Sequence, residues 1–198
     1  MRIEALTGEA LDAALDDVAE LRIRVFRDWP YLYDGDPNYE REYLETYRTS
    51  EAALLVGAFD GAKLVGAATG TPMTDHAEDF AAAFDQTGLR LADIFYCAES
   101  VLLPEYRGQG VGHRFFDLRE AHGRSLGATV SAFCGVVRPQ DHPLRPAGYW
   151  PLDGFWRKRG YVPLDGAVAW FSWKDVDHTD ETKKPLQVWT RVLSGVGI

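Results

Sequence analysis

Apolar and polar positions follow two different periods along the chain, and together they predict a mixed α/β fold. Apolar residues recur every three or four positions over residues 8–26 and 110–126, as one buried helix face requires. The stretches 54–59 and 64–71 read as strands, and Asp60-Gly61 between them is a strong hairpin signal. Other strands are predicted at 2–6, 93–103, 128–137, 168–173 and 186–193, and other helices at 39–49, 75–86 and 152–159. Without a repeat or linker, we expect a single domain over residues 1–198.

A glycine-rich segment, Arg107-Gly108-Gln109-Gly110-Val111-Gly112, lies between a predicted strand and a predicted helix. This order directs several backbone N–H groups toward one point, at the positive end of a helix dipole. Glycines also allow a positive φ and a close approach of a ligand to the main chain. The segment therefore predicts a phosphate cradle made of backbone. It lacks the Lys of a Walker loop, and its third glycine comes one residue too early for a dinucleotide fingerprint.

Two motifs resemble those of the GNAT superfamily of N-acetyltransferases. Arg107-x-x-Gly110-x-Gly112 is similar to its acyl-coenzyme A pyrophosphate loop, and residues 152–161 are similar to its Phe-Tyr-x-x-x-Gly-Phe segment. The resemblance covers about residues 1–193. It implies an α/β (mixed, α+β-like) fold whose central, mostly antiparallel sheet has about seven strands, splayed between the fourth and fifth and flanked by helices. It also implies acetyl-coenzyme A, or another acyl-coenzyme A, as cosubstrate.

The resemblance assigns this cosubstrate a set of residues on the fourth strand, the loop and the second motif. The pantetheine arm would bond to fourth-strand backbone around Val101 and Leu103. The complete set is Val101, Leu102, Leu103, Arg107, Gly108, Gln109, Gly110, Val111, Gly112, His113, Arg114 and Trp156. For His113 and Arg114, solvated positions on the first helical turn are the alternative.

In the family an amine attacks the thioester directly, so the ammonium needs a general base and the developing oxyanion needs a donor. Glu99 is our candidate base, because a carboxylate in an apolar strand is costly unless it is paired or functional. An ion pair with a nearby Arg is the structural alternative. Tyr96, expected on the opposite strand face, is the alternative polar group.

For the leaving-group acid the sequence departs from the family's pattern, because Trp156 stands where the family has Tyr. An indole N–H donates a hydrogen bond but is no acid near neutral pH. Tyr149, just upstream, is our candidate phenol, although thiolates leave readily without an acid. Cys134 would face the splay; an acyl-cysteine route is open there, but a small buried hydrophobe is the simpler interpretation.

Two loops supply candidate substrate contacts. The segment 29–36 combines aromatic rings and carboxylates, which suits an amine or ammonium, and the Pro-rich segment 138–151 follows the fifth strand. The candidates are Tyr31, Tyr33, Asp34, Asp141 and His142. The alternative for both segments is a loop that packs against the domain or stiffens its surface.

Composition and charge limit which partners and which cellular location we expect for this protein. A net charge of -9 and a pI near 5.0 argue against nucleic acid, and no apolar stretch reaches the roughly 20 residues of a membrane span. The two cysteines lie in apolar runs and the N-terminus lacks a signal-peptide pattern, so we expect a cytoplasmic protein. The histidines lack metal-ligand spacing, so we expect no metal. The apolar strand Gln187–Leu193 would pair in a homodimer if it were an exposed edge.

These observations predict an N-acyltransferase, most simply an N-acetyltransferase, that acts in a ternary complex on a primary amine of a small molecule or peptide. The alternative is a non-catalytic acyl-coenzyme A sensor or interaction module with a degenerate site. Trp156 is the feature that favours this alternative, whereas the intact loop and Glu99 favour the enzyme.

Overall fold

The computed structural model describes residues 1–193, and an eight-stranded sheet runs through them. Its strand order is β1-β2-β3-β4-β6-β8-β7, with β5 paired to β3 beside this path. The strands are β1 (Arg2–Leu6), β2 (Leu54–Asp60), β3 (Lys63–Pro72), β4 (Ile94–Tyr96), β5 (Ser100–Leu102), β6 (Val130–Val136), β7 (Val162–Lys174) and β8 (Glu181–Val192). All the pairings are antiparallel except that of β4 with β6. This confirms the predicted mixed fold; residues 194–198 of the predicted domain lie outside the described residues.

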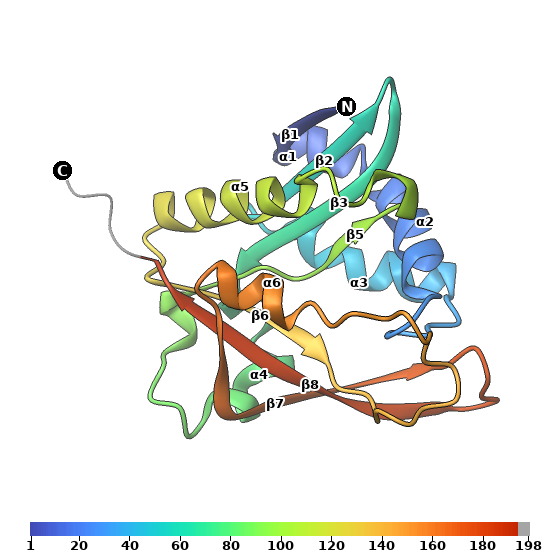
Figure 1. Cartoon of the computed structure of the whole chain (residues 1–198). Helices are drawn as coiled ribbons and strands as arrows, with labels where there is room; N and C mark the ends of the chain where they lie inside the picture. Colours follow the sequence, from blue (N-terminus) through green and yellow to red (C-terminus); the bar gives the residue numbers. More distant parts are fainter. Residues whose placement is uncertain (194–198) are drawn as a thin grey trace.

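Helices cover both faces of the sheet (Figure 1). They are α1 (Gly8–Asp12), α2 (Leu15–Phe26), α3 (Pro37–Thr49), α4 (Ala77–Phe84), α5 (Val111–Ser125) and α6 (Asp153–Lys158), with short 3-10 turns at Met73–His76, Leu91–Asp93 and Pro104–Tyr106. The helix predicted over 8–26 is in fact two helices, because the Ala14 N–H donates to Leu11 O, three residues back, instead of continuing the α-helical pattern.

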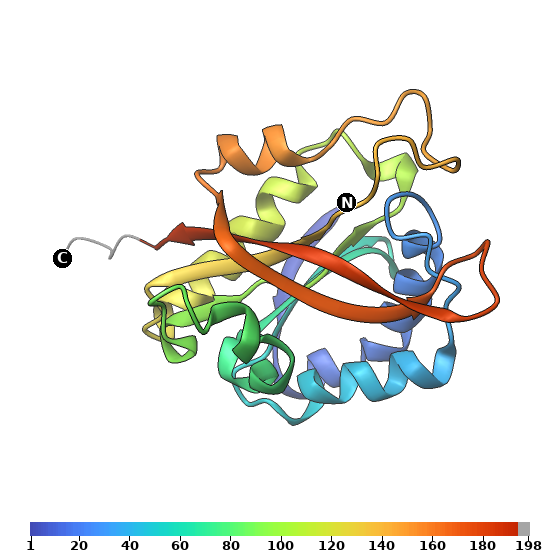
Figure 2. The same cartoon turned by 90° about the horizontal axis from the view of Figure 1, so that it is seen from below.

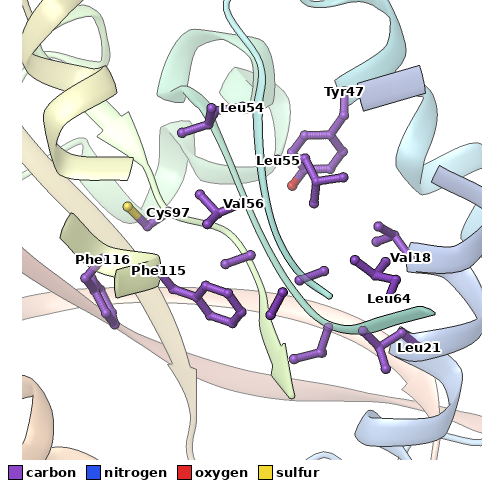
Figure 3. Packing of buried hydrophobic residues seen from close by; sticks show 14 of the residues in the cluster. Val18, Leu21, Tyr47, Leu54, Leu55, Val56, Leu64, Cys97, Phe115 and Phe116 are labelled. Atoms are coloured by element: carbon purple, nitrogen blue, oxygen red, sulfur yellow. The ribbon is translucent and has the colours of Figure 1, made fainter. Parts of the chain in front are cut away.

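Successive side chains along a strand point to opposite faces of the sheet, and this produces the two layers of the core. Figure 3 shows Val56 on the side of Phe115 and Phe116 of α5, whereas Leu55 faces Val18 on α2. These five side chains are at most 5% exposed. Burial of apolar residues on both strand faces stabilises the sheet by about 25 cal/mol for each Å² removed from water. The sheet is therefore held rigidly where it meets α2 and α5.

The strand predicted over 93–103 breaks in the middle, and this break opens the sheet. β4 pairs with β6, and the Cys97 N–H still donates to Ala132 O at 2.7 Å. Beyond the break β5 pairs with β3, while β6 continues beside β8. The expected splay between the family's fourth and fifth strands is therefore the opening between β5 and β6.

The last strand is not an edge of the sheet. β8 lies between β6 and β7, and β7 and β8 form a long curved hairpin (Figure 2). The edge argument for a homodimer through Gln187–Leu193 is therefore wrong. β7 begins at Val162, earlier than the predicted strand 168–173, and its added length covers β8.

Candidate active site

The glycine-rich loop connects β5 to α5 with an open array of N–H groups. Gly108 and Gly110 have φ values of 76° and 80°, a region that favours glycine. Gly110 is the N-cap of α5 and its carbonyl accepts from the His113 and Arg114 N–H groups. In the described part of the chain, the successive N–H groups of 108–112 donate to no backbone carbonyl. The loop thus presents unpaired donors at the positive end of a 15-residue helix.

Gly112 differs from the other two glycines of the loop. Its φ is not positive, and a Cβ added there would lie 3.4 Å from the nearest atom of Phe155, an ordinary contact. Neither backbone conformation nor packing within the protein demands a glycine at this position.

The open edge of β5 is shifted by one residue from the prediction. The Leu103 N–H donates to Val65 O at 3.0 Å, so the backbone groups of Val101 and Leu103 face β3. Because these groups alternate along a strand, those of Ser100 and Leu102 face the splay. The prediction of backbone contacts at Val101 and Leu103 is therefore wrong in register, and Leu102 is the member of the predicted set on the open side. Its carbonyl accepts from Arg107 Nε at 3.2 Å.

A cavity of about 100 Å³ lies beside the break between β4 and β5. It is formed by the break itself, α2, α3, α4, the 29–36 loop and the hairpin β7–β8, and most of its lining side chains are aromatic. The lining residues are Arg22, Phe26, Tyr31, Tyr33, Tyr39, Tyr43, His76, Asp79, Phe80, Tyr96, Ala98, Glu99, Cys134, Phe171, Trp173 and Leu186.

Glu99 is a buried member of this lining. Its Oε2 accepts from the Tyr43 hydroxyl at 3.0 Å and from the Tyr47 hydroxyl at 3.5 Å, and it lies 3.0 Å from Arg22 Nη1. The other oxygen, Oε1, is buried and has no hydrogen-bond partner among the described residues. An ion pair with an Arg, the structural alternative for Glu99, is thus present, and one carboxylate oxygen remains unpaired.

Arg22 joins Glu99 to a second buried carboxylate. Its Nε donates to Glu40 Oε2, and its guanidinium carbon lies 4.1 Å from the centre of the Tyr43 ring. Burial by itself would lower the pKa of Arg22, but Glu99, Tyr43 and Glu40 around it raise that pKa well above its ordinary value. Arg22 therefore stays charged between two carboxylates, and Glu40 Oε1 is a further buried oxygen without a partner.

The strand break also decides the positions of Tyr96 and Cys134. Because alternation is interrupted at 97–99, Tyr96 lines the same cavity as Glu99, and its predicted place on the opposite face is wrong. Cys134, on β6, lines the cavity too. Burial raises the pKa of the Cys134 thiol and keeps it protonated, which weakens it as a nucleophile. Burial likewise raises the pKa of the Tyr96 phenol.

Arg138 ties the 29–36 loop to the rest of the site. It donates to Pro30 O and Tyr31 O, and both of its terminal nitrogens contact the buried Asp175 carboxylate. Lys184 Nζ lies 3.1 Å from the same carboxylate. This network fixes the loop so that Tyr31 turns into the cavity.

Of the predicted substrate residues, Tyr31 and Tyr33 line the cavity, and the other three do not. Asp34 pairs with Arg27 and Lys174. Asp141 is exposed, and His142 packs on Trp29 with ring centres 5.1 Å apart. Tyr149 packs on the same Trp29 ring at 5.9 Å, also outside the lining. His142 and Tyr149 therefore pack on the Trp29 ring and do not line the cavity.

Residues 15–146 match the model of the acetyltransferase (GNAT) family. This chain belongs to that family. No curated protein matches the chain in sequence at a significant level.

Solved structures of GNAT enzymes have a similar fold. An aminoglycoside 6'-N-acetyltransferase in complex with coenzyme A has a TM-score of 0.61 at 16% identity, with all of both chains covered. A ribosomal-protein-alanine N-acetyltransferase from Brucella melitensis has a TM-score of 0.60 at 12% identity, over 97% of this chain and 99% of that one. An N-acetyltransferase from Staphylococcus aureus Mu50 has a TM-score of 0.60 at 8% identity, over 98% and 100%. At these identities the likeness shows the fold alone.

Trp156 takes the place of the Tyr in the second GNAT motif, and its ring is packed between two others. The centres of Phe133 and Trp189 lie 4.9 and 5.1 Å away. A Cβ on Gly135 would approach the Trp156 ring to 3.0 Å, so the ring covers β6 closely. His113 and Arg114 are exposed on the first turn of α5, and His113 packs against Phe155 at 4.9 Å.

Sequence reasoning missed Arg22, Glu40 and Tyr43, which complete the Glu99 cluster. A signal existed for Arg22, because it follows the buried Leu15 and Val18 at helical spacing and thus places a charge on an apolar face. For α3 the signal was the four-residue spacing of Tyr39, Tyr43 and Tyr47, visible as successive ring pairs.

Two further observations concern ligands and membranes. Among the described residues, Asp175, Asp177 and His178 lie close enough together to hold a cation. The Asp175 carboxylate is already paired with Arg138 and Lys184, so the group makes a poor cation site. Within residues 1–193, the helices are too short or too polar to cross a membrane.

Proposed function

We propose that this GNAT protein is an acyl-coenzyme A-dependent N-acyltransferase, most simply an N-acetyltransferase, that acts on a primary amine in a ternary complex. The observation that carries the proposal is the position of Glu99. Glu99 lines the cavity beside the splay, its buried Oε1 has no hydrogen-bond partner among the described residues, and the glycine loop follows at the other end of β5. An amine acceptor and a phosphate-bearing donor would thus meet at one opening of the sheet.

Two features of the loop support acyl-coenzyme A as its ligand. The open N–H groups of 108–112 and the dipole of α5 would hold its pyrophosphate. Close approach of that group to the main chain explains the glycine at 112, which the protein's own packing does not require. When bound, the cosubstrate supplies an activated acyl group as a thioester.

The chain's own groups then have three tasks. Glu99 Oε1 accepts a proton from the ammonium, and the cavity orients the amine beside the splay. The backbone edge at Leu102 orients the pantetheine arm, and a free N–H at this edge stabilises the developing oxyanion. Arg22 and the Tyr43 hydroxyl hold Glu99 in place. The protonated thiol of Cys134 argues for direct attack by the amine over an acyl-cysteine route.

Binding of acetyl-coenzyme A, measured by calorimetric titration, tests the donor half of this proposal. We expect micromolar binding to the wild type. Gly112→Glu should weaken it by at least about tenfold, because a carboxylate would face the pyrophosphate at a few Å. Ser125→Glu, at the exposed far end of α5, is the matched control and should bind like the wild type. Equal affinity of the two variants for acetyl-coenzyme A would show that the pyrophosphate does not bind at this loop.

The same experiment extends to turnover, which separates the enzyme from the non-catalytic sensor. Trp156 in place of Tyr is the observation that favours a sensor. Coenzyme A release that depends on an added amine would establish the enzyme. Tight binding without turnover on a broad amine panel would favour the sensor.

A further inference from the structure

The cavity beside Glu99 carries an unbalanced formal charge. Glu40 and Glu99 share the single guanidinium of Arg22. Each of the two carboxylates has one buried oxygen without a partner among the described residues. The cluster therefore has a formal charge of minus one, in a setting where a buried unpaired charge is costly. A cationic ligand would complete it.

Most of the remaining cavity wall is aromatic, and six of its rings form two close groups. Phe26, Tyr31 and Trp173 form one, with neighbouring centres 4.3 and 6.0 Å apart. Phe80 forms the other with Tyr96 and Phe171, at 4.8 and 5.6 Å. Aromatic faces attract cations and also provide apolar contact for another ring.

The cavity is a poor binding site for an anionic group. Arg22 is the single Lys or Arg among the lining residues of the described chain, and its charge is outweighed by Glu40 and Glu99. Asp79 adds another carboxylate to the lining. A substrate carboxylate placed here would lose its water without gaining a free cation.

The size and position of the cavity limit the rest of the ligand. A volume of about 100 Å³ is of the order that one aromatic ring fills, since an apolar cavity of about 150 Å³ binds benzene. The cavity reaches the strand break at Ala98 and Glu99 and the β6 residue Cys134, so it opens on the splay. An ammonium at Glu99 would thus lie at the splay, and its apolar part would point toward the rings.

We infer that the acceptor is a primary amine joined by a short chain to one aromatic ring, without a carboxylate. The inference rests on the proposed function, because it names the class of amine that the enzyme acylates. In the reaction one N–C bond forms and the thioester C–S bond breaks. Of the two protons that the ammonium loses, one is released to solvent and the other ends on the sulfur of coenzyme A.

The test uses phenethylamine and three relatives that each change one property. Butylamine lacks the ring, 2-phenylethanol lacks the charge, and phenylalanine adds a carboxylate. Each is titrated calorimetrically into the protein at pH 8, with and without coenzyme A, and then offered with acetyl-coenzyme A. We expect phenethylamine to bind at least about tenfold more tightly than every relative, and to be acetylated faster than the two other amines.

Three results would overturn the inference: equal or better binding of phenylalanine or butylamine, faster acetylation of either of these two amines, or no phenethylamine binding at millimolar concentration. Failure of the proposed function gives a different pattern. Acetyl-coenzyme A would then not bind, whereas phenethylamine would still bind in preference to its relatives.

A charge variant sharpens the test without touching the cavity lining. Glu40→Gln removes the surplus charge and keeps Glu99 paired with Arg22. This variant should bind phenethylamine about tenfold more weakly than the wild type does. Its affinity for 2-phenylethanol should be unchanged, since the alcohol carries no charge. Equal weakening of the binding of both ligands by a variant that keeps the wild-type circular dichroism spectrum would contradict the charge argument. Glu42→Gln, exposed on the same helix, is the matched control.

Discussion

The glycine loop and the aromatic cavity lie at opposite ends of β5, and they are built in opposite ways. The loop is a local structure: residues 108–112 follow one another, its donors are backbone groups, and the loop glycines are accessible to solvent. The cavity is made of side chains from helices, strands and loops that are distant in sequence, and its charged centre is buried. Under the proposed function the loop would bind any acyl-coenzyme A, because all of them share the same pyrophosphate. Under the same proposal the cavity carries the specificity for the amine, because side chains and not backbone groups line it.

Glu99→Gln should produce the largest effect on the cavity while leaving the loop unchanged. The amide keeps the shape and can still accept from Tyr43, but it cannot take the ammonium proton. We expect kcat with the acceptor amine to fall about a hundredfold or more, with unchanged acetyl-coenzyme A affinity. Steady-state kinetics and calorimetry measure the two quantities. Glu51→Gln, an exposed residue outside the site, should match the wild type in both. Full turnover by Glu99→Gln would refute the assignment of the base.

Arg119→Met should destabilise the strand break before β5, which lies between the glycine loop and the aromatic cavity. Arg119, on α5, is fully buried and donates to Glu99 O, Thr69 O and the Ser100 hydroxyl at the strand break. Removing the guanidinium deletes these three buried hydrogen bonds, although Thr69 O and Glu99 O each keep one backbone donor, so the free energy of unfolding should fall by about 3 kcal/mol.

Urea denaturation measures the effect of Arg119→Met. Arg124→Met, on the same helix with a side chain that is 27% exposed, is the control and should change stability much less. A stable Arg119→Met protein with wild-type kinetics would show that the break holds its form without this arginine.

The Asp175 network makes the loop that carries Tyr31 sensitive to acid. Burial alone would raise the pKa of Asp175, but Arg138 and Lys184 hold it below the ordinary value of 3.8. Because the pKa of Asp175 is lowered in the folded state, its ion pairs with Arg138 and Lys184 stabilise the fold at pH values above the unfolded-state pKa. This stabilisation is lost as pH falls through the folded-state pKa.

Asp175→Asn tests this acid sensitivity. At pH 7 the variant should be less stable than the wild type, and the gap should narrow as pH falls below about 4. Urea melts between pH 7 and pH 3 measure the gap. A gap that stays constant with pH would mean that the carboxylate charge contributes nothing.

Trp156→Tyr should have the smallest effect, although it restores the phenol of the GNAT motif. Trp156 packs between Phe133 and Trp189, so we expect kcat to change by less than about tenfold, below the contribution typical of a general acid. Trp156→Phe controls for ring size. A large gain specific to the Tyr variant would show that the site lacks an acid and benefits from one.

The sequence by itself determined what depends on neighbours along the chain. Strand, glycine loop and helix follow in the order that 100–126 predicts, because glycine conformations and helix starts are local properties. The hairpin at Asp60-Gly61 and the family membership carried by the loop belong to the same class. Glu99 also stood out locally, as a carboxylate in an apolar strand.

Only the tertiary structure decided what surrounds Glu99. Its partners Arg22 and Tyr43 lie on α2 and α3, far away in sequence, and no local pattern specifies which helix faces meet across a sheet. The break at 97–99 reversed the expected face of Tyr96, because a single interruption changes the alternation of every later side chain. Asp34 and His142 have the chemistry of substrate contacts, but packing gave them other partners. Local conformation thus made the glycine loop predictable, whereas the aromatic cavity depends on long-range packing that a sequence pattern does not contain.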